Sequence, residues 1–247
     1  SAGSGAMVSC VPAGSSAGTL RGGGDGSDPG SGSGATKTAT GVSAEMVEKF
    51  TALRKWGYAA IDQRVALLDN IAGPNGTIVF TSDHGMAGVA KDVHINTALE
   101  RAGLLAYDER QRISQRETRA VNNKYGVMVN TTDWKGGIVP LEERKAAVDQ
   151  IEKVLAAIVD PETGKPVITA FFRPETHPEL GIGGPAGSDL YYDLAPGYST
   201  SERPSAEIIT RKRAPVGEHG FLPTRDDMLA SFIARGPRFG KGVNAPR

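Results

Sequence analysis

The chain has 247 residues, of which 39% are hydrophobic and 23% are charged, so it is long enough and apolar enough to bury a sizeable core. Lys plus Arg and Asp plus Glu both number 28, and a formal net charge of zero argues against a protein dedicated to binding a nucleic acid polymer. The single cysteine, Cys10, excludes a disulfide framework within the chain, and no apolar stretch reaches the roughly 18 residues of a membrane-spanning helix.

Residues 1–42 consist mostly of Gly, Ser, Ala and Thr. Such a segment cannot bury enough apolar surface to offset the entropy lost on ordering. We therefore expect a disordered Gly/Ser-rich arm, a linker or a corrupted start of the chain. The segment also lacks the basic start and apolar run of a signal peptide.

A helix is predicted to begin after Ser43, which can cap its first turn. Its apolar residues recur with helical spacing at Met46, Val47, Phe50, Leu53, Ile61, Val65, Leu68 and Ile71. A turn at residues 74–76 (Pro-Asn-Gly) separates it from residues 77–81 (Thr-Ile-Val-Phe-Thr), a β-branched and aromatic run without polar alternation. This run predicts a strand buried on both faces, as in a parallel sheet covered by helices.

Further elements follow in the order expected of an α/β protein. Residues 93–105 predict a short strand or turn and then a helix that ends near Gly103, and residues 125–130 and 167–172 predict strands. Residues 141–159 predict an amphipathic helix whose apolar face holds Val148, Ile151, Val154, Leu155 and Ile158. Residues 173–205 are rich in Pro, Gly and Tyr and predict an irregular excursion, and residues 228–234 predict a last strand or helix.

Asp83 and His84 come directly after the predicted strand at 77–81. Ligands of open α/β sheets bind beyond the carboxyl ends of the strands, and a carboxylate oxygen with an imidazole nitrogen suits zinc. Gly85 lets the chain turn there without a Cβ penalty. The alternative interpretation is a capping Asp beside a His that is satisfied within the protein.

His219 lies in residues 217–220, which read Gly-Glu-His-Gly, and the flanking glycines predict a tight loop that presents the imidazole. By itself, a histidine in such a loop is equally compatible with an ordinary surface residue. Residues 227–237, which read Asp-Met-Leu-Ala-Ser-Phe-Ile-Ala-Arg-Gly-Pro, give this loop a context.

Residues 81–86 (Thr-Ser-Asp-His-Gly-Met), residues 93–105, and the block formed by residues 218–221 and 228–237 resemble the type I phosphodiesterase/nucleotide pyrophosphatase family of the alkaline phosphatase superfamily. The resemblance implies an α/β fold with an alkaline-phosphatase-like mixed sheet flanked by helices, incomplete at its N-terminal side. It covers residues 43–247, which would form the C-terminal part of the catalytic domain.

Members of that family hold two zinc ions with three Asp and three His, and a Thr or Ser attacks phosphorus. The resemblance implies that Asp83 and His84 bind the metal that activates the nucleophile, and that His219 binds the other. Such a pair of ions can clamp the attacking and leaving oxygens of an in-line displacement. The implied activity is metal-dependent hydrolysis of phosphodiester or pyrophosphate bonds in a small phosphodiester or nucleotide substrate.

The chain departs from the family pattern before residue 43. The family's first aspartate, its nucleophile and its Asp-x-x-Gly-His-x-x-Gly-Pro block have no counterpart here, and the hydroxyls of Ser31, Thr36 and Thr38 are poor matches to the nucleophile. The catalytic nucleophile is therefore not identified, and about half of the two-zinc site is present. One zinc ion or none is an open alternative to two.

Three functional hypotheses remain: the phosphodiesterase, an inactive fragment or degenerate copy that binds at most one metal, and a sulfatase or phosphomutase of the same superfamily. Without its first strands, the sheet would leave an unpaired edge at residues 77–82, from which we expect marginal stability or self-association. Asp189, Tyr191, Tyr192 and Asp193 either line a substrate pocket, since tyrosines stack on bases, or pack under a loop.

Overall fold

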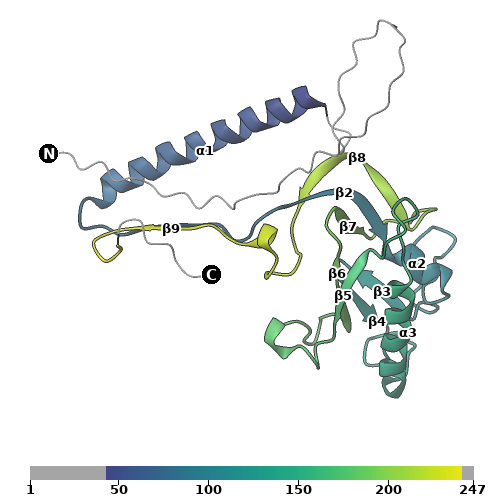
Figure 1. The fold of residues 1–247 in the computed structure, drawn as a ribbon. Helices are drawn as coiled ribbons and strands as arrows, with labels where there is room; N and C mark the ends of the chain where they lie inside the picture. The colour runs from purple at the N-terminus through teal and green to yellow at the C-terminus, as the bar shows by residue number, and fades with distance from the viewer. Residues whose placement is uncertain (1–42, 241–247) are drawn as a thin grey trace, which may run out of the picture. The chain divides into compact units, whose positions relative to one another are not determined.

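The computed structural model describes residues 43–240, and the predicted segment 1–42 lies outside them. The described residues divide into two compact units, one formed by residues 43–84 together with 230–240, and one formed by residues 85–229. The described part contains three α-helices and three β-sheets, a mixed α/β fold as predicted (Figure 1). None of the helices in residues 43–240 combines the length and apolar character that a membrane crossing requires.

The first unit contains helix α1 (Ala44–Ala72) and strands β1 (Ile78–Thr81) and β9 (Phe232–Arg235). The Ser43 side chain accepts a hydrogen bond from the Met46 amide at 3.2 Å, so the predicted N-cap is confirmed. The helix continues through Gly57 to Ala72 and is capped by Gly73, whose amide donates to the Asp69 carbonyl and whose φ of 70° favours glycine.

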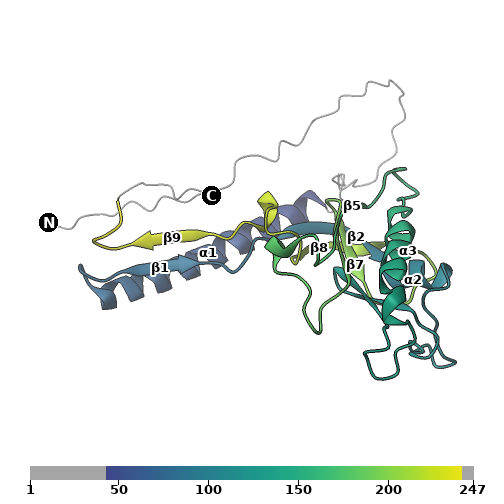
Figure 2. The ribbon, with the colours of Figure 1, turned by 90° about the horizontal axis from the view of Figure 1, so that it is seen from below.

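The prediction that residues 77–81 form a strand buried on both faces is wrong. Strand β1 pairs antiparallel with β9 in a two-stranded sheet (Figure 2), and β9 is its only strand neighbour among the described residues. Val79 is 50% exposed, and the four residues of β1 alternate between half-buried and exposed. An apolar run predicts a strand, but it carries no information about which neighbours are present to cover it.

The apolar residues of α1 are also exposed. The helix has no buried residue, and Phe50, Trp56 and Ile71 are 61%, 73% and 73% exposed. Helices of soluble proteins usually gain most of their stability from packing an apolar face, so α1 is stabilised here mainly by its own hydrogen bonds and cap.

Exposed apolar surface of this kind favours association between chains. We expect the purified chain to self-associate as its concentration rises, because association would cover the α1 face or the open edge of β1. Sedimentation velocity over a concentration series measures this directly. A monomer that melts sharply and cooperatively at every concentration would contradict the prediction.

The second unit holds a three-stranded and a four-stranded sheet. In the first, β2 (Ala87–His94) lies between β7 (Tyr198–Ser201), which is parallel to it, and β8 (Ile209–Glu218), which is antiparallel. The second sheet has the order β3-β4-β6-β5 and is antiparallel throughout, with bounds Ala120–Asn123, Gly126–Val129, Leu190–Leu194 and Ile168–Phe172.

Helices α2 (Ile95–Arg101) and α3 (Arg144–Ala156) contact each other, and α3 also contacts β4 and β5. Short 3₁₀ turns at Leu141–Glu143, Pro178–Leu180 and Asp226–Met228 complete the described elements. The predicted apolar face of residues 141–159 is confirmed, since Val148, Ile151, Leu155 and Ile158 are all buried. Burial of that face contributes to the hydrophobic stabilisation of the unit.

Residues 173–205 are less irregular than predicted, because they contain both β6 and β7. Strand β8 was not predicted from its sequence at all. Its residues are mostly exposed and include Arg211, Lys212 and Arg213, so it lacks the apolar run by which a strand is recognised. Its pairing with β2 is what holds it in the sheet.

Candidate metal site

Asp83 and His84 lie immediately beyond the end of β1, as predicted. The strand end is tied to the segment before β9 by two hydrogen bonds: the Ser82 amide donates to the Ser231 carbonyl at 3.0 Å, and the Ser231 amide donates to Ser82 Oγ at 2.8 Å. This pairing anchors the backbone from which both candidate ligands project.

The two candidate ligands also contact each other. The His84 amide donates to Asp83 Oδ1 at 3.0 Å, and His84 Nε2 lies 3.4 Å from Asp83 Oδ2. Two ligand atoms bound about 2.0–2.1 Å from one tetrahedral zinc stand about 3.3–3.4 Å apart. The carboxylate oxygen of Asp83 and the imidazole nitrogen of His84 therefore have the chemistry and the separation of two ligands in the coordination sphere of one zinc ion. The Asp83 side chain is 84% exposed, so this candidate ligand is accessible from solvent.

A glycine at position 85 was predicted to let the chain turn, but the structure requires glycine there because another backbone segment lies too close for a Cβ atom. Its φ is not positive, but a Cβ atom built on it would lie 2.1 Å from the Asp227 carbonyl oxygen. The Gly85 amide donates to the Met228 carbonyl at 2.9 Å. The glycine thus permits close backbone approach to residues 227–228.

His219 follows directly after β8, in the second unit, and is exposed. The next residue, Gly220, has a φ of 97°, and a Cβ atom on it would lie 3.0 Å from the Tyr125 ring. Both the backbone conformation and the ring therefore favour glycine at this position. The predicted tight loop around His219 is confirmed on its C-terminal side, while Gly217 and Glu218 belong to the strand.

In residues 43–240, no group of three or more His, Cys, Asp and Glu side chains is placed so that it could hold a metal ion. Asp83 and His84 are the pair brought together within the first unit, and His219 belongs to the second. The hydroxyl candidates Ser31, Thr36 and Thr38 lie outside the described residues. The roles of Asp83, His84 and His219 as ligands stay a prediction.

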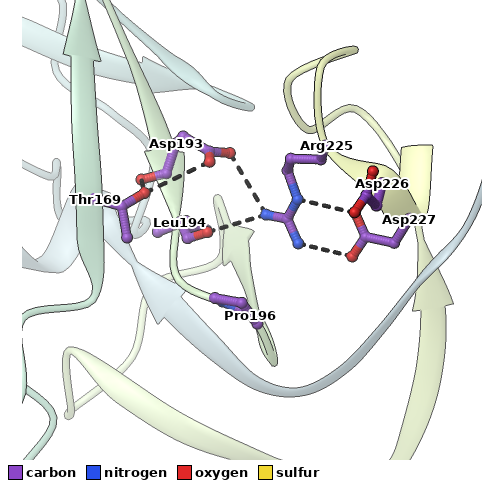
Figure 3. A pocket seen from close by; sticks show the side chains of 7 residues that line it. All are labelled: Thr169, Asp193, Leu194, Pro196, Arg225, Asp226 and Asp227. Atoms are coloured by element: carbon purple, nitrogen blue, oxygen red, sulfur yellow. Dashed lines mark hydrogen bonds and ion pairs between the residues drawn. The ribbon is translucent and has the colours of Figure 1, made fainter. Parts of the chain in front are cut away.

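A hollow of ≈ 390 Å³ in the second unit is lined by seven residues, among them Arg225 (Figure 3). The Arg225 guanidinium donates to Asp227 at 3.0 and 2.9 Å and to the Leu194 carbonyl at 3.1 Å, and it lies 3.6 Å from Asp193. Hydrogen bonding to Arg225 lowers the pKa of Asp227. Since two carboxylates already neutralise Arg225, we do not assign this hollow to phosphate binding.

The tyrosines of residues 189–193 divide between the two predicted roles. Tyr191, Tyr192 and Asp193 line a second hollow of ≈ 460 Å³. Tyr192 is also a packing residue, because its hydroxyl lies within hydrogen-bond distance of Asn122 Oδ1 (2.7 Å) and of the Lys124 carbonyl oxygen (2.6 Å), and burial raises its pKa. Asp189 accepts a hydrogen bond from the Val129 amide at 2.6 Å and pairs with Arg144, which is a structural role.

A comparison with protein-family models finds one match, to Type I phosphodiesterase / nucleotide pyrophosphatase, over residues 44–222 of the 247. The matched range includes Asp83, His84 and His219. No curated protein matches the sequence closely enough to add to this finding.

Proposed function

Because the chain belongs to the type I phosphodiesterase/nucleotide pyrophosphatase family, a family of hydrolases, we propose that it cleaves phosphodiester or pyrophosphate bonds of a small substrate with the help of zinc. The observation that carries the proposal is the extent of the family match, which spans both predicted ligand segments in a single range. The zero net charge agrees with a small substrate rather than a nucleic acid polymer.

In this proposal Asp83 and His84 are ligands of one zinc ion and His219 is a ligand of a second. The Asp83–His84 separation of 3.4 Å supports the first assignment. Bound zinc supplies a Lewis acid and positive charge beside the phosphoryl oxygens. Asp83, His84 and His219 would supply three of the six ligands expected in the family, so the proposal assigns residues to about half of the two-zinc site.

Zinc content and hydrolysis together test the proposal. The purified chain is loaded with zinc, analysed by elemental analysis, and assayed with bis(p-nitrophenyl) phosphate. We expect bound zinc and a hydrolysis rate that a chelator abolishes and added zinc restores, because charge neutralisation at phosphorus depends on the ion.

The same measurements separate the alternatives. Two zinc ions per chain with hydrolysis indicate a complete site, whereas one or none without hydrolysis indicates the inactive fragment or degenerate copy. Preferential hydrolysis of p-nitrophenyl sulfate indicates the sulfatase alternative. Phosphodiester hydrolysis that persists after complete zinc removal would rule out the proposed role of the metal.

A further inference from the structure

Arg225 lies between the loop that carries His219 and strand β9, and its side chain is 15% exposed. Its guanidinium forms a fork with the Asp227 carboxylate through two nitrogens, and the third nitrogen donates to the Leu194 carbonyl at 3.1 Å (Figure 3). A planar guanidinium that uses all three nitrogens in this way has a fixed orientation. The contacts of Arg225 on its two sides therefore show which parts of the chain it holds in place.

One side of Arg225 contacts the segment that follows His219. The guanidinium carbon lies 4.3 Å from the ring centroid of Phe221, which is two residues after His219, and the Arg225 amide donates to the Leu222 carbonyl at 3.1 Å. The Phe221 side chain is buried, and its ring centroid lies 5.2 Å from that of Tyr125. Cation–π and aromatic contacts of this kind fix the ring, so Arg225 holds the C-terminal end of the loop that presents the imidazole.

The other side of Arg225 leads to the backbone that follows His84. The Arg225 carbonyl accepts a hydrogen bond from the Met228 amide at 3.0 Å, and the Met228 carbonyl accepts one from the Gly85 amide at 2.9 Å. Gly85 is the residue after His84, and its Cα lies so close to the Asp227 carbonyl that a Cβ atom would clash with it. The fork between Arg225 and Asp227 therefore fixes the segment against which the Gly85 backbone packs.

The same two segments are also joined by strand pairing. Ala87, which is three residues after His84, lies opposite Glu218, which directly precedes His219, in the antiparallel pairing of β2 with β8. Strand β2 begins at Ala87 and β8 ends at Glu218, so this pairing does not extend to the loop beyond them. Side-chain contacts have to fix that loop, and Arg225 supplies contacts to both segments.

We propose that Arg225 is a positioning residue of the zinc site, which holds the His219 loop and the backbone after His84 in one fixed arrangement. Residues that orient metal ligands without touching the metal typically change metal affinity or activity by about 10–100-fold when they are replaced. The roles of the histidines as zinc ligands rest on the proposed function, whereas the joining of the two segments by Arg225 does not.

Two variants of the full chain test the proposal. Arg225→Met removes the fork but keeps an unbranched side chain beside Phe221, and Arg225→Lys keeps the positive charge without the planar fork. We expect each to weaken zinc binding, measured by competition with a chromogenic chelator, by about 10-fold or more. Each should also change the visible absorption spectrum of the cobalt(II)-loaded chain, because that spectrum depends on the geometry of the metal ligands.

A second measurement needs no metal. Hydrogen–deuterium exchange of the zinc-free Arg225→Met variant should be faster by about 10-fold or more at the amides of Gly85 and Met228 and in residues 219–222, because these segments lose a shared contact. The amides of α3 should exchange as they do in the unaltered chain, since their hydrogen bonds lie within the helix.

Arg173→Met is the matched control. Arg173 is another arginine of the second unit, its side chain is 20% exposed, and it pairs with two carboxylates, those of Glu152 and Asp149. Both partners lie on α3, so this variant loses ion pairs of the same kind away from the two candidate ligand segments. It should leave the zinc affinity and the cobalt(II) spectrum unchanged.

Unchanged exchange in Arg225→Met would overturn the proposal, as would faster exchange without any loss of zinc affinity. Full zinc affinity in Arg225→Lys would also overturn it, because charge alone would then suffice. An equal loss of zinc affinity in Arg173→Met would do the same, because general destabilisation would then explain the effect. If the unaltered chain binds no zinc, the proposed function fails, and the exchange measurement alone decides whether Arg225 joins the two segments.

Discussion

Replacement of Asp83 or His219 by alanine is expected to lower kcat/KM for bis(p-nitrophenyl) phosphate by about 10³-fold, because removing a metal ligand forfeits several kcal/mol of transition-state stabilisation. Asp83→Ala should also lower the zinc content, since the carboxylate lies 3.4 Å from His84, the other ligand proposed for the same ion. Both side chains are on the surface, so the melting temperature should change little.

Two matched variants control for general effects. Asp62→Ala removes an exposed carboxylate from α1. His177→Ala removes a histidine of the second unit that lies outside the two motifs at residues 81–86 and 218–221. Both should retain activity close to that of the unaltered chain. If kcat/KM of the folded Asp83→Ala variant stays within about threefold of that value, Asp83 takes no part in the mechanism.

Replacement of Asp160 by alanine is expected to destabilise the chain by about 3 kcal/mol, because it removes the buried partner of Lys91 and leaves only the more exposed Glu162 beside that charge. Asp160 is fully buried and accepts hydrogen bonds from Lys91 and from the Tyr198 hydroxyl. Lys91 is itself 8% exposed and also lies 2.9 Å from Glu162. Chemical denaturation monitored by circular dichroism measures the loss, and removing Asp108, which is half-buried and pairs with the largely exposed Arg112, should cost less.

The pH dependence of stability gives an independent measurement of the same interaction. Burial opposes ionisation of Asp160, but hydrogen bonds from Lys91 and Tyr198 outweigh it and lower its pKa from 3.8 to about 2. The stabilisation is therefore present above about pH 4 and is lost as the pH falls towards 2. Asp160→Asn should show a shallower decline of the unfolding free energy over this range, and an unchanged decline would exclude Asp160 as its cause.

Local elements were predicted well because their signals lie within short windows. The helix at Ala44–Ala72 follows from its cap and periodicity, and the buried face of α3 follows from the spacing of Val148, Ile151 and Leu155. The family, and with it the mixed α/β fold class, was recognised from residues 81–86 and 218–221, and the match over residues 44–222 confirms it.

Long-range features were not predicted. The pairing of β8 with β2 and the contact of Lys91 with Asp160 join residues about 70 to 130 positions apart, which no local periodicity encodes. The exposure of β1 was also not predicted, because it depends on which other elements pack against the strand. The hollow of ≈ 460 Å³ was anticipated only through Tyr191, Tyr192 and Asp193, because its other lining residues come from separate elements.

By itself, the sequence determined the long helices and several of the strands, the family to which the chain belongs, and the residues that are candidate zinc ligands. These are properties of residue type and spacing along the chain. The tertiary structure alone decided that β1 pairs only with β9 among the described residues, that Asp160 is a buried charge, and that residues from several separate segments line one hollow. Burial and electrostatic environment arise from atoms distant in sequence, so they exist only once the chain has folded.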